Sequence, residues 1–254
     1  MISQAAPDIR RLPLFRNMTM ANFTTLTEYA SVIHVPSGHI VVEQGAAADH
    51  LFIVVEGAVE LFAQWGQREC TMGVIRPVGT FILAACIKDA PYLMSARCLE
   101  PSSIVLLPAT DLRAVFRRDP DFAVSVIDEL AGDFRRVVRH AKGLKLRDTQ
   151  HRIAAYLLEQ SQLAGADTFF LRAEKRHVAS YLGMTPENLS RGLRSLEAQG
   201  VSVAGQQIII HDRPRLVAFV QPDVLMDGPD TPGGGAAGVG LPAPAMTALP
   251  RQGG

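Results

Sequence analysis

The sequence is poor in cysteine and has no long apolar run, and these absences exclude several classes of protein. Its three cysteines, Cys70, Cys86 and Cys98, fit neither a CxxC nor a Cys/His spacing, so we expect no disulfide framework, zinc finger or iron-sulfur cluster. No stretch reaches the roughly 18 uninterrupted apolar residues of a transmembrane helix, and the N-terminus does not read as a signal peptide. We therefore expect a cytoplasmic protein with no membrane partner.

The chain also lacks a dominant charge and a catalytic constellation. Lys plus Arg and Asp plus Glu both number 25, although basic residues are in slight excess between residues 144 and 220. No Ser/His/Asp set or metal-ligand spacing is present, and the GGG near the C-terminus has neither the lysine nor the strand-to-helix context of a P-loop. The sequence therefore does not predict an enzyme, and the sign of the local charge excess suits DNA.

Hydrophobic residues make up 48% of the 254 residues, which is enough to form two hydrophobic cores. Between residues 32 and 107 short strand-like runs alternate with Gly or Pro, as in a barrel or sandwich, and a small helix is predicted near residues 22–29. Further along, VSVAGQQIIIHD predicts a β-hairpin, or wing. The Gly, Pro and Ala composition from residue 223 onward predicts a disordered tail.

A long helix is predicted to start at Asp119-Pro120, with Asp as its N-cap and Pro at its first position. Along it, apolar residues recur at alternating spacings of four and three, which is the pattern of a coiled-coil seam. The pattern predicts a homodimer, and the alternative is a helix that lies on its own domain. The predicted seam comprises Ile127, Leu130, Phe134, Val137, Ala141 and Leu144.

The most informative segment is EKRHVASYLGMTPENLSRGLRSLEAQG. A helix-turn-helix needs a small residue in its first helix, a Gly four residues later and an aliphatic residue ten residues later, and Ala179, Gly183 and Leu189 meet this spacing. In the second helix Glu187 could accept a hydrogen bond from cytosine and Arg191 could donate two to guanine. The alternative is an ordinary charged surface helix. The full set of predicted DNA contacts, to bases or phosphates, is Lys175, His177, Thr185, Glu187, Asn188, Ser190, Arg191 and Arg194.

From about Leu12 to Phe219 the chain resembles the CRP/FNR superfamily of bacterial transcription regulators, through LPLF, VPSGHIVVEQGAAADHLFIVVEGAVELF and VASYLGMTPENLSRGLRSLEAQG. The resemblance implies an α+β fold with a cyclic-nucleotide-binding-type β-roll over residues 1–118, a dimerisation helix over 119–145 and a winged helix-turn-helix over 146–222, followed by the tail over 223–254. It also implies a homodimer that binds double-stranded DNA and RNA polymerase. Glu187 followed by Ser190-Arg191 resembles the base-reading set of the FNR branch, which reads palindromes of TTGAT-type half-sites.

The sensing half departs from members that bind cyclic AMP. Those members carry a Gly-Glu pair and then an Arg-Ser or Arg-Thr that neutralises the cyclic phosphate, whereas here Thr80 replaces the glutamate and Tyr92-Leu93 take the Arg-Ser positions. A buried, unpaired phosphate is costly, and Arg97 is the only nearby charge that could pair with it. We therefore expect an effector other than a cyclic nucleotide. The alternatives are a cyclic nucleotide in an atypical pocket and a regulatory module that binds a protein instead of DNA.

The chain lacks the N-terminal cysteine cluster of the oxygen-sensing branch. Its Gly79-Thr80-Phe81 followed by Asp89, Pro91 and Tyr92 instead resembles the pattern of the DNR and NnrR branches, which respond to nitric oxide, usually through heme. The implied effector site comprises Gly79, Thr80, Phe81, Tyr92, Met94 and Arg97. For an axial heme ligand the sequence offers His34, His39, His50, Cys86, Tyr92 or Met94, with no motif that selects one. His34 is kept as a candidate ligand, against the alternative of a core histidine.

Overall fold

The structure, a computed structural model, describes residues 9–171, 173–228 and 245–246 of the chain. It divides into two compact units, with the boundary between Val137 and Val138, and each is described by itself. The first unit contains α2 (Pro13–Arg16), α3 (Met20–Thr27), β1 (Ser31–Val35), β2 (Ile40–Val42), β3 (His50–Glu56), β4 (Val59–Trp65), β5 (Arg68–Ile75), β6 (Gly79–Phe81), α4 (Leu83–Lys88), β7 (Ser95–Cys98), β8 (Ser102–Pro108), α5 (Ala109–Arg118) and the first part of α6 (Pro120–Leu146).

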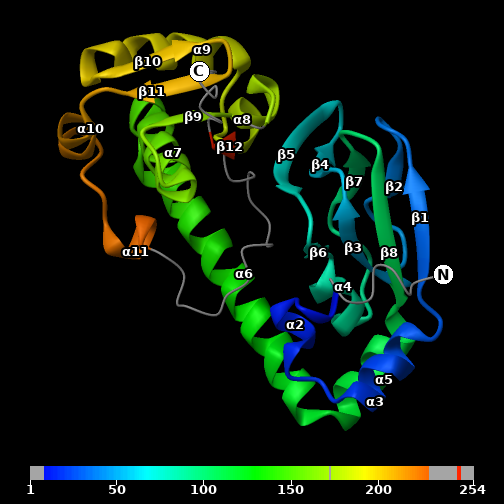
Figure 1. Cartoon of the computed structure of the whole chain (residues 1–254). Coiled ribbons are helices and arrows are strands. Elements are labelled where there is room, and N and C mark those ends of the chain that lie inside the picture. Colours follow the sequence, from blue (N-terminus) through cyan, green and yellow to red (C-terminus); the bar gives the residue numbers. More distant parts are fainter. Residues whose placement is uncertain (1–8, 172, 229–244, 247–254) are drawn as a thin grey trace, which may run out of the picture. The chain divides into compact units, whose positions relative to one another are not determined.

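The strands of the first unit form two four-stranded antiparallel sheets, ordered β1-β8-β3-β6 and β2-β7-β4-β5 (Figure 1). Side chains alternate across each strand, so the apolar run of β3 is buried on both faces. One face joins an interior cluster between the sheets, and the other packs against the helices. The interior cluster comprises Val42, Ala48, Phe52, Val54, Val59, Leu61, Ile75, Phe81, Tyr92, Ala96, Cys98 and Ile104. This arrangement confirms the predicted β-roll.

Gly57 forms the turn between β3 and β4 with φ +89°. A Cβ at this position would lie 2.6 Å from the Pro101 carbonyl oxygen and 2.7 Å from Ser102 Cα, both of which are backbone atoms. Gly45 has a similar φ of +87° but nothing within 4 Å of the same position. The two glycines therefore share a left-handed backbone and differ in whether a side chain would fit.

We expect Gly57→Ala to lower the free energy of unfolding by about 2–5 kcal/mol, since left-handed strain adds to overpacking against a fixed backbone. The matched variant Gly45→Ala suffers only the backbone strain and should lose about 1–2 kcal/mol. Urea titrations of both proteins measure the difference. Equal losses would show that the close approach of residues 101–102 does not constrain this turn.

Helix α6 begins as predicted at Asp119, which is 3% exposed. The Phe122 amide donates to Asp119 Oδ1 at 3.0 Å, and Asn22 Nδ2 on α3 donates to Oδ2 at 2.7 Å. Burial raises the pKa of Asp119, but these hydrogen bonds outweigh it and hold the pKa below its usual value. The capping carboxylate thus also joins α3 to the start of the long helix.

The second unit contains the end of α6, α7 (Thr149–Ala164), β9 (Thr168–Phe170), α8 (Lys175–Tyr181), α9 (Pro186–Ser195), the 3₁₀ turn η2 (Leu196–Gln199), β10 (Val201–Ala204), β11 (Gln207–Ile210), α10 (Arg213–Val220), α11 (Val224–Asp227) and β12 (Ala245–Met246). Its sheet has the order β10-β11-β9-β12. The hairpin β10–β11 is the predicted wing, and the unit confirms the winged helix-turn-helix.

Two short segments within the predicted tail, residues 223–254, have secondary structure. Residues 224–227 form α11, because the Asp223 side chain accepts from the Leu225 amide at 2.8 Å and caps the helix. Residues 245–246 form β12, which pairs with β9. The remainder of the predicted tail lies outside the described residues. In the part of the chain that the structure describes, no helix has the length and apolar character needed to cross a membrane.

Candidate nucleic-acid interface and effector site

The helix-turn-helix is formed by α8, the turn at residues 182–185 and α9. Ala179 is fully buried, Leu189 is 1% exposed, and Gly183 has φ +65° in the turn, a conformation that favours glycine. The Met184 amide donates to the Ala179 carbonyl at 3.0 Å and closes the turn. Ala179 and Leu189 thus lie in the core and Gly183 lies in the turn, as their spacing predicts.

The N-terminus of α9 presents polar side chains on one face. Thr185 Oγ1 accepts from the Asn188 amide at 3.2 Å and caps the helix, while Pro186 takes the first position. Glu187, Ser190 and Arg191 are exposed. The opposite face carries Leu189, Leu193 and Leu196, which are buried in the core of the unit. The exposed polar side chains of α9 therefore take no part in the packing of the core.

Glu187 and Arg191 carry opposite charges one helical turn apart on this face. Hydrogen bonds from its own backbone amide and from Thr185, together with the charge of Arg191, hold the pKa of Glu187 below its usual value. Arg191 Nη2 also donates to Asn188 Oδ1. At neutral pH the face therefore offers an acceptor-only carboxylate beside a guanidinium donor, which can serve the two bases of a C·G pair or neighbouring pairs.

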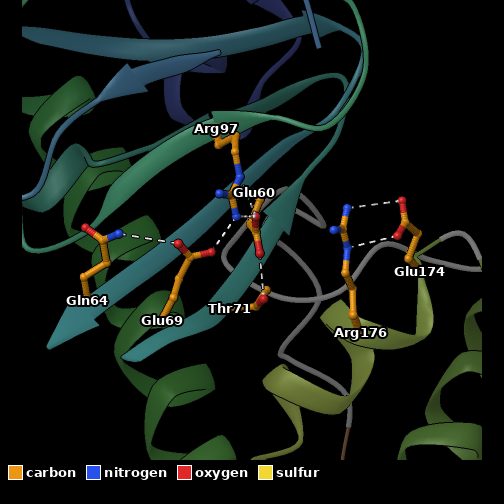
Figure 2. A network of polar contacts seen from close by, with 7 residues as sticks. All are labelled: Glu60, Gln64, Glu69, Thr71, Arg97, Glu174 and Arg176. Carbon is orange, nitrogen blue, oxygen red and sulfur yellow. Dashed lines mark hydrogen bonds and ion pairs between the residues drawn. The ribbon is translucent and has the colours of Figure 1, made fainter. Parts of the chain in front are cut away.

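The predicted phosphate contacts are placed unevenly. Arg194 is exposed and Lys175 is half-buried. Arg176 is exposed and its Nε lies 3.0 Å from Glu174 Oε2 (Figure 2). His177 is only 4% exposed, so the protein covers its ring. A buried ring does not fit the predicted contact with a DNA phosphate. His177 precedes Val178 and Ala179 on the face of α8 that enters the core.

Sequence reasoning missed Gly192, in the middle of α9. A Cβ at Gly192 would overlap Ile153 Cδ1 of α7, so this glycine allows α9 and α7 to approach closely. A glycine inside an otherwise amphipathic helix was the available signal. Gly192 therefore sets how closely α9 packs against α7.

The structure brings part of the predicted effector site together in the interior of the β-roll. Phe81 stacks on Phe52 with ring centroids 5.2 Å apart, and Tyr92 meets Phe52 edge-on at 6.3 Å. Met94 is half-buried against the interior cluster. Gly79 and Thr80 precede Phe81 on the buried strand β6. The interior at this point is largely aromatic and apolar.

Two polar groups at or near this site, Tyr92 and Cys86, have hydrogen-bond partners within the protein. Tyr92 Oη lies 3.1 Å from Asp49 Oδ1 and 3.2 Å from the His50 carbonyl oxygen, and Cys86 Sγ lies 3.1 Å from that carbonyl oxygen. Burial raises the pKa of Tyr92 to about 12 and the pKa of Cys86 to about 12. Both groups are therefore neutral at physiological pH.

Arg97 does not share this interior. Its neighbours Ala96 and Cys98 belong to the interior cluster, so Arg97 lies on the opposite face of β7, as Glu60 does on β4. Arg97 Nη2 lies 2.7 Å from Glu60 Oε2 and 2.6 Å from Glu69 Oε1 (Figure 2).

Two further contacts complete the surroundings of Arg97. The guanidinium lies over the Phe62 ring at 4.5 Å, and Thr71 Oγ1 donates to Glu60 Oε1 at 2.6 Å. Burial lowers the pKa of Arg97, but the two carboxylates outweigh it and raise the pKa above its usual value. The carboxylates of Glu60 and Glu69 therefore bind the guanidinium of Arg97, which was expected to pair with a cyclic phosphate if one were bound.

Three of the candidate heme ligands, His34, Tyr92 and Cys86, do not suit a heme in the interior. His34 is exposed on β1, its Nδ1 lies 2.9 Å from Ser103 Oγ, and it alternates with Ile33 and Val35, which pack on the interior cluster. Tyr92 and Cys86 would have to lose protons to ligate iron, against the direction of their pKa values. In the described parts of the chain no group of three or more His, Cys, Asp or Glu residues is arranged to hold a metal ion.

The predicted dimer seam lies along α6. Ile127, Phe134 and Val137 are 58%, 68% and 60% exposed in the single chain. Leu130 is half-buried on the helix side of the β-roll, and Leu144 lies against Gly183 of the second unit. These side chains leave large apolar surface exposed along α6 in the single chain.

Comparison with known proteins agrees with both units. Residues 32–119 match the family model of the cyclic nucleotide-binding domain, and residues 151–219 match that of the Crp-like helix-turn-helix domain. The "CRP-like cAMP-activated global transcriptional regulator" of Mycobacterium tuberculosis is 23% identical over 217 residues, which cover 82% of this chain and 96% of that protein. The nitrogen fixation regulation protein FixK of Azorhizobium caulinodans is 24% identical and covers 66% of this chain and 71% of its own. The solved structure of FixK2 from Bradyrhizobium japonicum aligns with a TM-score of 0.65 at 25% identity, over 74% of this chain and 96% of that one.

Proposed function

Since the chain belongs to the CRP/FNR family of transcription regulators, with a cyclic nucleotide-binding domain followed by a Crp-like helix-turn-helix, we propose that it binds palindromic DNA as a homodimer. Glu187, Ser190 and Arg191 of α9 read TTGAT-type half-sites in the major groove. An effector within the β-roll controls this binding, and the DNA-bound dimer acts on RNA polymerase.

The observation that carries the proposal is the N-terminal face of α9. It combines a capped helix end, an exposed carboxylate and an exposed guanidinium one turn away, above a fully buried leucine face. Recognition helices place such N-terminal side chains against base edges. Two copies related by the α6 seam would reach half-sites one helical turn apart, about 34 Å.

For the effector we propose an uncharged molecule that is not a cyclic nucleotide. The interior next to Phe81 and Tyr92 is aromatic, and Arg97 lies on the other face of its strand, bound to Glu60 and Glu69. A cyclic phosphate placed in the interior would therefore lose its hydration without gaining this cation. Nitric oxide sensed through heme stays a prediction from the sequence pattern, because the surroundings of His34, Tyr92 and Cys86 give it no support.

Fluorescence anisotropy with a duplex that contains two TTGAT-type half-sites tests the proposal. We expect affinity at least about 10³-fold above that for a scrambled duplex, and a linear fall of log K with log salt concentration. Insertion of about five base pairs between the half-sites turns one of them to the other side of the helix and should abolish the preference. Cyclic AMP should leave the affinity unchanged.

Equal affinity for both duplexes would contradict sequence-specific reading. Absence of binding at every salt concentration would favour a regulatory module with a protein partner. A clear gain in affinity with cyclic AMP would contradict the proposed effector class.

A further inference from the structure

The residues 223–228, named here the C-terminal clasp, lie beyond residue 219, where the match to the Crp-like helix-turn-helix domain ends. They include α11 and fold back onto the end of α6. Arg147 Nη1 lies 2.7 Å from Asp227 Oδ1 and Nη2 lies 2.5 Å from Oδ2, which makes a two-point ion pair. Arg139 Nη1 donates to the Gly228 carbonyl at 2.6 Å. Two arginines thus hold the clasp.

The ion pair is sheltered from solvent. The side chains of Arg147 and Asp227 are 13% and 25% exposed. Burial raises the pKa of Asp227, but hydrogen bonds from Arg147 and from the Asp223 amide outweigh it and leave the pKa below its usual value. A sheltered guanidinium–carboxylate fork fixes both partners in direction as well as distance. The clasp therefore restrains the orientation of Arg147.

Arg147 stands at the junction between α6 and α7. It follows the last residue of α6 and precedes Asp148, which caps α7 by accepting from the His151 amide at 2.9 Å. Arg152 of α7 donates from Nη1 to the Arg147 carbonyl at 2.9 Å and from Nε to the Leu182 carbonyl at 2.9 Å. The Arg152 side chain therefore links the α6–α7 junction to the turn that precedes α9.

A second contact joins the same two places. Leu144 Cδ2 lies 3.0 Å from the position that a Cβ of Gly183 would take. The end of α6 thus contacts the turn through Leu144, Arg152 of α7 joins Arg147 to the same turn, and Asp227 of the clasp pairs with Arg147. The clasp, the junction and the turn form a continuous set of contacts within the second unit.

We propose that Arg147, held by Asp227, is a positioning residue for DNA recognition: the clasp fixes the α6–α7 junction and, through Arg152 and Leu144, the turn that presents α9. The DNA part of this inference rests on the proposed function, whereas the effect on the junction does not. Release of the clasp should loosen residues 144–152 and weaken binding to the palindrome.

The test compares three full-length variants with the wild type. Asp227→Asn removes the carboxylate charge, and Arg147→Lys keeps the charge but cannot form the two-point pair. Asp167→Asn is the matched control, since it removes the same charge from the ion pair with Arg213, elsewhere in the same unit. The control corrects for the general effect of one less negative charge on DNA affinity.

Two readouts are taken from each protein. Amide hydrogen exchange over residues 144–152 and 182–185 should become at least about tenfold faster in Asp227→Asn and in Arg147→Lys, while the control exchanges like the wild type. Affinity for the TTGAT palindrome should fall at least about fivefold in the same two variants and stay within about twofold in the control.

If amide exchange at the junction is unchanged in Asp227→Asn and Arg147→Lys, the clasp does not fix the junction and the proposal is wrong. Faster exchange with unchanged DNA affinity would overturn the positioning role. If the wild type does not prefer the palindrome at all, the proposed function fails, and the exchange experiment still decides whether the clasp holds the junction.

Discussion

Arg191→Ala is expected to lower the affinity for the palindromic site by about 30-fold to 10⁴-fold. A bidentate contact to guanine contributes about 1–3 kcal/mol of discrimination, and a symmetric dimer loses two of them, with each 1.4 kcal/mol equal to a factor of ten. The Arg191 side chain is exposed on α9, opposite the buried Leu189 and Leu193, so its truncation should leave the fold intact. Anisotropy titrations on the palindrome and on a scrambled duplex measure the change.

Arg194→Ala provides the comparison on the same helix. Arg194 is also exposed, and a phosphate contact carries no sequence information, so its loss should weaken binding to both duplexes by a similar factor. Arg191→Ala should instead spare the scrambled duplex. If both variants lose affinity for both duplexes alike, Arg191 is not a base-reading residue.

Phe134→Glu is expected to raise the dissociation constant of the homodimer at least about 100-fold. Burial of one large apolar side chain contributes about 1.5–3 kcal/mol, and two-fold symmetry removes two of them while bringing two carboxylates into the seam. Phe134 is 68% exposed in the single chain and so contributes little to its own fold. Sedimentation velocity over a concentration series should show the monomer at concentrations where the wild type is dimeric.

Arg135→Glu introduces the same side chain at the neighbouring exposed position, which lies off the seam. It should leave the dimer intact. Arg135→Glu makes the larger change in charge, so it measures the general electrostatic effect on DNA affinity, and Phe134→Glu should lose more affinity than this control because its dimer is lost. A Phe134→Glu protein that remains dimeric would place the interface on another surface.

The parts of the fold that were predictable depend on local signals. The cap at Asp119, the cap at Thr185 and the spacing from Ala179 to Leu189 each act within a few residues, and each is found in the structure. Strand pairing is different, because the facing of a side chain depends on register. Arg97 and Glu60 are directly opposite on β7 and β4, and no pattern within either strand reveals that partnership.

The heme-ligand and tail predictions show the same limit. His34 sits in an apolar strand, yet alternation places its ring on the exposed face beside Ser103. Composition predicted disorder from residue 223, although Asp227 finds Arg147 80 residues earlier in the chain. An ion pair over that distance depends on the folded path of the chain, which composition does not record.

The exposed apolar stripe of α6 affects how operator occupancy would depend on the concentration of this regulator. When only the paired form binds an operator and chains are scarce, the paired form increases with the square of chain concentration. A halving of the protein at cell division would then cut the bound fraction by up to about fourfold, so Ile127, Phe134 and Val137 would set a threshold copy number for the promoter as well as an assembly state.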